Sequence, residues 1–215
     1  MDRQTYASLH RDRYMNWAVR VGASHYSNTE RFEWAIITAH TGFRTSVGGF
    51  LATRAETTVQ GLATALTGAG VLGAGNKAGY IWALRTGLES GELSLPIPPY
   101  RAWRREYKLP GLMHTKLSFG IALCEPCCAD VVCIDTHIAA VYGADYRRTL
   151  RSIDEYEKIE REIVREAATV GLPPFVYQWA VWDWQRGRTR HVPPEDHSVL
   201  WAGGMSKYQL PLFSG

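Results

Sequence analysis

Two side chains near a glycine turn are the residues of this sequence best suited to chemistry. Lys116 comes five residues after Gly111, and Asp135 stands directly before a short helical pattern. A lysine amine whose charge is disfavoured by burial is a nucleophile, and a carboxylate stabilises positive charge or accepts a proton. We therefore predict Lys116 and Asp135 as the catalytic residues. The alternative for each alone is structural, Asp135 as a helix N-cap and Lys116 as a solvated phosphate contact.

The turn before Lys116 has the features of a phosphate-binding hairpin. Leu109, Pro110 and Gly111 favour a tight turn, and helical spacing resumes at His114. Amides at the start of a helix bind a phosphate and anchor a nucleic-acid backbone without reading its sequence. The residues expected to contact DNA here are Gly111, Leu112, Met113, His114 and Thr115.

Further residues are candidates for contacts to DNA and to the substrate. Arg104 and Arg105 belong to a basic group that precedes the hairpin, and such a group suits phosphate. His40 and Thr41 end an early helical pattern, and the family resemblance described below makes them candidates to fill the gap that a flipped base leaves. The expected substrate pocket is completed by His137 and Phe119.

The elements that must position these residues are helices. Apolar residues recur at helical spacing along most of the chain, and we find no sustained strand alternation and no repeat, so the sequence predicts an all-α fold. Asp135 stands where an N-cap carboxylate receives the first free amides of a helix. Helices are expected over residues 29–42, 46–54, 57–66, 76–88, 100–108, 114–123, 136–141 and 153–170, and from 174 onward.

Composition bounds the class of protein. The chain has 215 residues, of which 46% are hydrophobic and 21% charged, which is too apolar for a disordered chain and too mixed for a membrane protein. No apolar signal region begins the sequence, so we expect a cytoplasmic protein without membrane contact. The net charge of +3 with a pI near 8.7 does not by itself indicate nucleic-acid binding, although the basic residues are clustered.

Cysteine spacing argues against a structural metal. All four cysteines fall between Cys124 and Cys133, whereas structural zinc sites join two ligand pairs across a longer loop. We expect reduced thiols and no metal site here, because disulfides are rare in the cytosol.

The order of motifs between Leu109 and Gly143 resembles the helix-hairpin-helix (HhH-GPD) DNA glycosylase superfamily. The matching elements are the Leu-Pro-Gly hairpin, Lys116 at the start of the next helix and an Asp-Thr-His sequence that begins at Asp135. The resemblance covers roughly residues 30–186 and implies a two-lobed helical fold that flips a base out of double-stranded DNA. It implies no iron–sulfur cluster, because no cysteine lies beyond Cys133.

The resemblance also divides the chain and sets its expected ligands. It gives an N-terminal helix or arm over 1–28, the helical core over 29–187 and a C-terminal tail over 188–215 that packs on the core. We expect a monomer that needs no organic cofactor, with a monovalent cation at the hairpin as the one candidate ion.

Departures from the glycosylase hairpin point to a particular branch. The second hairpin glycine is missing, and one extra residue precedes Lys116. With Cys133 two residues before Asp135, these features resemble the phage alpha-glutamyl/putrescinyl thymine pyrophosphorylases, also called amino acid:DNA transferases. That branch implies that an amino acid or polyamine displaces pyrophosphate from an activated 5-hydroxymethyl group on a pyrimidine in DNA.

Two other functions stay open. The first is a base-excision DNA glycosylase/AP lyase, in which Lys116 attacks the sugar C1′ to form a Schiff base and Asp135 stabilises the developing cation. The second is a DNA-binding module that has kept the fold without activity, since fold alone does not determine reaction type.

Overall fold

Every regular element in the described part of the chain is a helix. The computed structural model describes residues 1–22, 32–33, 35–36, 56–107, 113–127 and 130–190, and no strand occurs among them, which confirms the predicted all-α class. The helices are α1 (Arg3–Leu9), α2 (Arg11–Gly22), α5 (Val59–Gly68), α6 (Ala74–Ser90), α7 (Tyr100–Glu106), α8 (His114–Cys124), α9 (Thr136–Val141), α10 (Tyr146–Arg151), α11 (Ile153–Thr169) and α12 (Pro174–Arg190).

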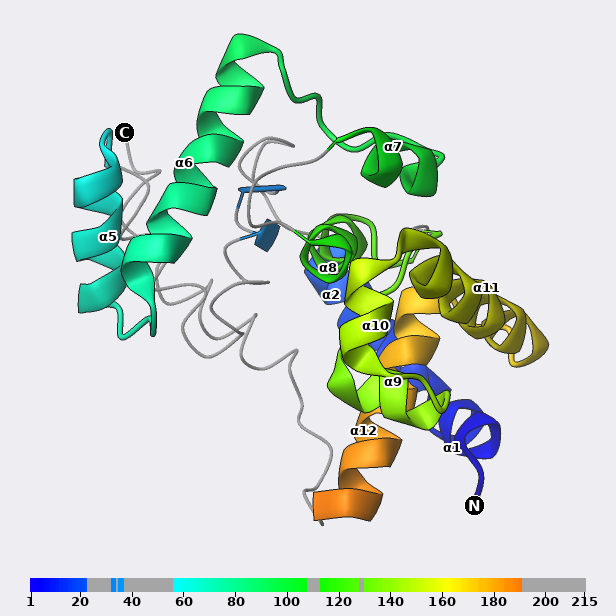
Figure 1. The fold of residues 1–215 in the computed structure, drawn as a ribbon. Coiled ribbons are helices and arrows are strands. Elements are labelled where there is room, and N and C mark those ends of the chain that lie inside the picture. Colours follow the sequence, from blue (N-terminus) through cyan, green and yellow to red (C-terminus); the bar gives the residue numbers. More distant parts are fainter. Residues whose placement is uncertain (23–31, 34, 37–55, 108–112, 128–129, 191–215) are drawn as a thin grey trace, which may run out of the picture.

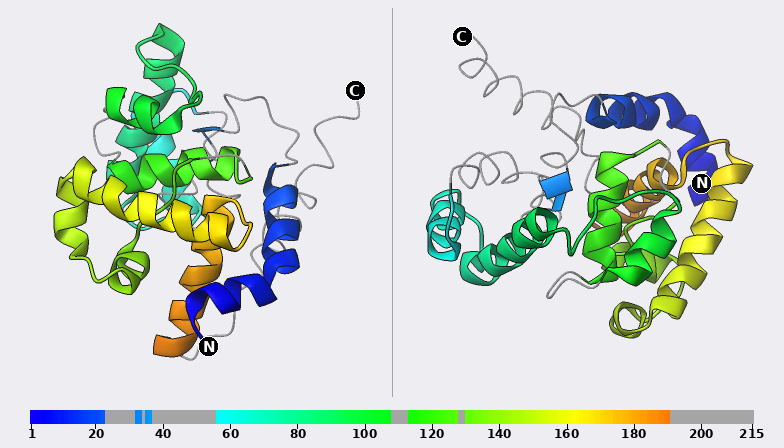
Figure 2. Two further views of the ribbon diagram at one scale, coloured as in Figure 1. Left: turned by 90° about the vertical axis from the view of Figure 1, so that its right-hand side faces the viewer. Right: turned by 90° about the horizontal axis from the view of Figure 1, so that it is seen from above.

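The helices form a pair and a larger group. Helices α5 and α6 lie side by side, joined by a short turn, and are set apart from the other labelled helices (Figure 1). In the larger group α12 packs against α1, α2, α9 and α11, while α8 packs against α2 and α7. Seen from above, the pair again lies to one side of the larger group (Figure 2, right).

Aromatic rings fill the centre of the larger group. The rings of Trp17 and Trp179 are stacked with centroids 5.0 Å apart, and Phe175 lies against both of them and against Phe119 of α8. The run from Phe175 to Val181 is buried at every position, so α12 is enclosed on all sides over this stretch, as expected of a central helix.

A few contacts join the pair to the larger group. Arg85 of α6 donates from Nε to the Glu33 carboxylate at 2.8 Å and from a terminal nitrogen to the Glu56 carbonyl oxygen at 2.9 Å. Phe32, beside Glu33 in the chain, meets Trp103 of α7 edge-on with ring centroids 5.7 Å apart. Residues 32 and 33 therefore contact both groups of helices.

The helix predictions are largely confirmed in the described ranges, with small shifts at the ends. Helix α6 begins at Ala74 rather than at residue 76, after Gly73 adopts a left-handed φ of 66°. The six-residue helix α10, capped by Asp145, was not predicted. The predicted helices over 29–42 and 46–54 lie mostly or wholly outside the described residues.

The predicted N-terminal helix or arm and the predicted tail each meet the core. Residues 1–22 form α1 and α2 and pack on the core through Tyr14, Trp17 and Ala18. Helix α12 continues to Arg190, which places the predicted start of the tail, residue 188, inside a helix. The rest of the predicted tail lies outside the described residues.

None of the helices in the described ranges combines the length and the apolar composition that crossing a bilayer requires.

Candidate active site at Lys116 and Asp135

The Asp135 carboxylate is fixed by three N–H donors. As the N-cap of α9, it accepts hydrogen bonds at Oδ1 from the backbone nitrogens of His137 at 3.0 Å and Ile138 at 2.9 Å. Its Oδ2 accepts the indole N–H of Trp182 at 2.7 Å. The N-cap role is therefore present, and it leaves acceptor capacity on Oδ2 for one further donor, because each carboxylate oxygen has two lone pairs.

Side chains hold the backbone that leads to Asp135. Residues 131–135 form no helix or strand, so their polar groups need partners from elsewhere. Val132 N donates to Glu160 at 3.0 Å, and Cys133 N donates to Gln178 at 3.3 Å. The Tyr156 hydroxyl donates to the Val132 carbonyl oxygen at 2.7 Å and accepts from Ile134 N at 3.0 Å. Helices α11 and α12 therefore set the position of this segment.

One hydrogen bond joins the residue before Lys116 to the residue before Asp135. The Thr115 hydroxyl of α8 donates to the carbonyl oxygen of Ile134 at 3.1 Å in a buried contact. Lys116 directly follows Thr115, and Asp135 directly follows Ile134. Lys116 and Asp135, which are 19 residues apart in sequence, therefore extend from neighbouring points of the backbone.

The Cys133 thiol lies within reach of both charges. Burial raises its pKa most, the negative charge of Asp135 raises it further, and the positive charge of Lys116 opposes both. Electrostatic effects of this kind fall off with distance, so the ammonium and the carboxylate both lie within electrostatic range of the thiol. A thiol with a raised pKa is protonated and is a poor nucleophile, which leaves Lys116 and Asp135 as the reactive groups.

A second lysine lies beside Lys116. Lys77, in the first turns of α6, has a pKa lowered first by burial and then by the positive charge of Lys116. Lys77 of the α5–α6 pair therefore lies within electrostatic range of Lys116 of the larger group. Two neighbouring ammonium groups repel one another, and an anion such as a phosphate group between them relieves that repulsion.

Tyr146 completes the surroundings of the site. Its hydroxyl pairs with the side chain of Thr115, and its pKa is raised by burial first and then by Cys133 and Asp135. Tyr146 is half-buried and stays protonated at neutral pH. It can therefore donate a hydrogen bond beside the carboxylate.

The prediction that Arg104 contacts DNA is wrong. Arg104 is only 1% exposed, and its guanidinium donates to Ser118 at 2.6 Å, to Glu160 at 2.8 and 2.9 Å and to Glu157 at 3.2 Å. A guanidinium enclosed by two carboxylates cannot reach a phosphate. Arg105 is 46% exposed but is engaged with Glu157 and Asp154 at 2.8 Å each, and its contact to DNA stays a prediction.

The remaining predicted residues divide into described and undescribed ones. His137 is half-buried, with its ring edge-on to Trp182 at 5.9 Å, and Phe119 packs on the core against Phe175 at 6.0 Å. Met113 is 45% exposed, and the His114 ring lies 6.1 Å from that of Tyr156. The predicted DNA contacts that lie outside the described residues are Gly111, Leu112, His40 and Thr41.

Cavities and thiols elsewhere do not form part of this site. A hollow of about 210 Å³ lies at the other end of α8, and one of about 460 Å³ lies between the N-terminus and the end of α12. Neither is lined by Lys116 or Asp135. Cys124 and Cys127 are free thiols, as is Cys133 of the site, and the described residues contain no group of three or more metal-binding side chains.

Comparison with known proteins adds no family. No family model, no curated protein and no solved structure matches this chain.

Four residues at the site, Trp182, Cys133, Lys77 and Tyr146, were not among the predicted ones. Trp182 lies 47 residues from Asp135, and its role depends on how α12 packs against α9, for which the sequence has no local signal. Cys133 was assigned only as a reduced thiol. Lys77 had a signal in the apolar pattern of its helix, which places it at a helix start, but its nearness to Lys116 depends on the arrangement of two separate groups of helices.

Proposed function

We propose that this protein binds double-stranded DNA and modifies a base that has been turned out of the helix beside Lys116 and Asp135. The reaction we propose is transfer of an amine, from an amino acid or a polyamine, to an activated 5-hydroxymethyl group on the base, with loss of pyrophosphate. The observation that carries the proposal is the buried hydrogen bond from Thr115 to the Ile134 carbonyl oxygen, which brings together the residues directly before Lys116 and Asp135. Lys77 lies within electrostatic range of Lys116.

Each charged group has a part in this reaction. The amine nitrogen attacks the methylene carbon attached to C5, a C–N bond forms, and the C–O bond to the pyrophosphate breaks with its electron pair leaving on oxygen. Lys116 and Lys77 balance the charge of the leaving group, since ammonium groups bind phosphate as point charges. The free acceptor site on Asp135 binds the incoming ammonium and takes up the proton that the amine loses.

The lysine pair is the reason for preferring transfer. A leaving pyrophosphate carries several negative charges, and two lysines from different helices, α6 and α8, supply opposing positive charge. Base excision develops positive charge on the sugar instead, for which a carboxylate suffices and a second ammonium is unfavourable.

An exposed side chain near the start of α6 is suited to replacing the extruded base. Leu72 is 86% exposed in the turn between α5 and α6, where Gly70 and Gly73 have φ values of 77° and 66°. Apolar side chains on tight turns insert between base steps in proteins that distort DNA. We assign this part to Leu72, five residues before Lys77.

Base excision is the second candidate, and one observation favours it. Burial and Lys116 lower the pKa of Lys77, which increases the fraction of its amine that is neutral. In this alternative the neutral amine of Lys77 attacks C1′ of the sugar, the glycosidic bond breaks with its electron pair leaving on the base nitrogen, and a Schiff base forms.

Mass spectrometry of nucleosides separates the two reactions. Duplex DNA containing pyrophosphorylated 5-hydroxymethyluracil is incubated with the protein and a mixture of amino acids and polyamines, and the DNA is then digested to nucleosides. We expect a nucleoside whose mass has increased by the amine, with release of pyrophosphate. Lys116→Met and Lys77→Met should each abolish most of this product, whereas Lys158→Met, which removes an exposed lysine of α11, should not.

The other outcomes are equally informative. Release of the free base, together with a covalent adduct trapped by borohydride, establishes excision and rejects transfer. An unchanged nucleoside and no free base, from a protein that still binds DNA, reject both reactions and leave a binding module.

A further inference from the structure

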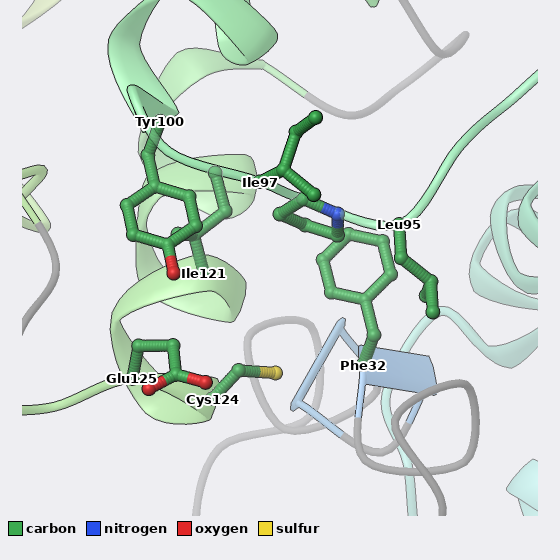
Figure 3. Close-up of a pocket in the computed structure, with 8 residues that line it drawn as sticks. Phe32, Leu95, Ile97, Tyr100, Ile121, Cys124 and Glu125 are labelled. Atoms are coloured by element: carbon green, nitrogen blue, oxygen red, sulfur yellow. The ribbon is translucent and has the colours of Figure 1, made fainter.

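A hollow at the C-terminal end of α8 is separate from the proposed active site. It has a volume of about 210 Å³ and lies between the end of α8, the segment before α7 and Phe32 (Figure 3). Glu125 in its wall follows Lys116 by nine residues, which corresponds to about 13 Å along a helix. A molecule bound here does not reach Lys116 or Asp135, so whatever the hollow binds is additional to the proposed reaction.

The lining is apolar at one end and polar at the other. Figure 3 shows the ring of Phe32 beside Leu95 and Ile97, away from the thiol of Cys124 and the carboxylate of Glu125. The hydroxyl of Tyr100 is on the same side as these two polar groups. The wall is completed by Ile121 and Pro96.

The polar end is negatively charged. Glu125 is half-buried, and its carboxylate makes no hydrogen bond or ion pair with any residue in the described ranges. It follows the last residue of α8, where backbone carbonyl groups without helical partners carry partial negative charge. The carboxylate and the helix end both favour a cation, and the carbonyl groups offer further hydrogen-bond acceptors.

The apolar end of the hollow is suited to the apolar part of a ligand. Phe32 is 1% exposed and Ile121 is fully buried, so part of the wall belongs to the core. A cavity of about 150 Å³ holds benzene. The present hollow therefore has room for one aromatic ring with a short chain, and the side chains of Phe32, Leu95 and Ile97 provide apolar contact.

We propose that this hollow is a binding site for a small organic ammonium ion, an arylalkyl primary amine about the size of phenethylamine. The ammonium group donates to the Glu125 carboxylate and to the carbonyl oxygens at the end of α8. The aromatic ring lies against Phe32, Leu95 and Ile97. No covalent step is involved.

Methyl-resolved NMR titration with phenethylamine tests the site on the full chain. We expect shifts of the Ile97 and Ile121 methyl signals, which line the hollow, and none for Ile163, which is buried in α11. 2-Phenylethanol and 3-phenylpropionate have the same ring but a neutral and an anionic end. They should bind at least about tenfold more weakly, because a hydrogen bond to a charged group accounts for that much affinity.

A matched pair of variants tests the charge. Glu125→Gln keeps the shape of the side chain and should raise the dissociation constant of phenethylamine about tenfold or more. Glu92→Gln removes the same charge from an exposed position outside the hollow and should leave it unchanged. The proposal is overturned if phenethylamine leaves Ile97 and Ile121 unshifted, or if the three compounds bind alike. It is also overturned if Glu125→Gln and Glu92→Gln bind phenethylamine equally. None of these outcomes depends on activity toward DNA.

Discussion

Trp182 fixes the Asp135 carboxylate from the side opposite the helix amides. Its indole N–H donates to Oδ2 at 2.7 Å, while both backbone amides reach Oδ1. The Arg186 guanidinium lies over the indole ring, 4.2 Å from its centroid. Trp182 therefore acts through Asp135, as a positioning residue, and Arg186 steadies it from above.

Replacing this indole should impair turnover while preserving DNA binding. In Trp182→Phe the ring remains and the N–H is lost, so Oδ2 loses its fixed donor. We expect kcat to fall about 10- to 100-fold, the range that corresponds to a hydrogen bond to a charged group. The dissociation constant for DNA should change little. Kinetics of the nucleoside assay and fluorescence anisotropy measure the two quantities.

Trp184→Phe is the matched control for this variant. Trp184 also donates its N–H, but to the carbonyl oxygen of Met1 at 3.2 Å in an exposed contact. Its replacement should leave kcat unchanged. Equal losses from the two variants would show that the indole at position 182 has no special relation to Asp135.

The position of Asp135 at a helix start could be predicted from local sequence, and its surroundings could not. An aspartate before an apolar helical pattern is a recognisable N-cap, and the structure confirms it. The bonds from Glu160, Gln178 and Tyr156 to residues 131–135 come from helices later in the chain, and they depend on tertiary packing.

The burial of Arg104 also depends on tertiary packing, and here the local sequence suggests an exposed residue. Four arginine and lysine residues precede the hairpin and suggest a basic surface. The structure instead places Arg104 against Glu157 and Glu160, which lie on the buried face of α11 beside Tyr156. Basic residues that are clustered in sequence form a basic surface only when no opposite charges are packed against them.

The approach of residues 35–36 to α8 requires a glycine. A Cβ added at Gly120 would lie 2.4 Å from Cδ1 and 3.2 Å from Cγ1 of Ile36, whose side chain is fully buried. Gly120→Ala should lower the free energy of unfolding by about 1–3 kcal/mol, the usual cost of overpacking, despite the better helix propensity of alanine. Urea denaturation measures this change.

A second substitution tests whether the clash is the cause. Ile36→Val removes the Cδ1 methyl group that the new Cβ would meet, so the double variant should be more stable than the sum of the two single effects predicts. Strict additivity would mean that Gly120 is needed for another reason.

Across the whole molecule, Glu166 joins several helices. Its carboxylate accepts hydrogen bonds from Arg3 of α1, from Tyr142 at the end of α9 at 2.7 Å and from Tyr177 of α12 at 2.8 Å. Burial alone would raise the pKa of Glu166, but these hydrogen bonds outweigh it and hold the pKa below its usual 4.5. The folded protein therefore binds this proton less readily than the unfolded chain.

Because the pKa of Glu166 is lowered in the folded state, the stability of the protein falls as the pH becomes acidic. The contribution of Glu166 is fully present above about pH 4.5 and is lost as the pH falls through the lowered pKa of the folded state. Glu166→Gln should lower the free energy of unfolding at neutral pH by about 1–2 kcal/mol, a modest value because Arg3 is partly exposed. The variant should also lose less stability on acidification than the parent protein does.

Denaturation series at about pH 7 and about pH 4 measure both effects. Glu155→Gln, which removes an exposed partner of Arg148, should cost about 0.5 kcal/mol or less. If Glu166→Gln loses as much stability in acid as the parent protein, the Glu166 carboxylate does not contribute to acid sensitivity.

The arrangement of the two helix groups is what brings the proposed site together. Lys77 comes from the α5–α6 pair, and Lys116 and Asp135 come from the larger group. We propose that DNA is bound where these two groups meet, between the two lobes that the resemblance implies.

A double-mutant cycle on Lys116 and Asp135 tests the central claim most directly. The rate of product formation on modified duplex DNA is measured for the parent protein, Lys116→Met, Asp135→Asn and the double variant. Because residues that act as a unit are not additive, we expect the double variant to be no slower than the slower single variant. Losses that multiply, or single variants as fast as the parent, would contradict joint action of these two residues on one base.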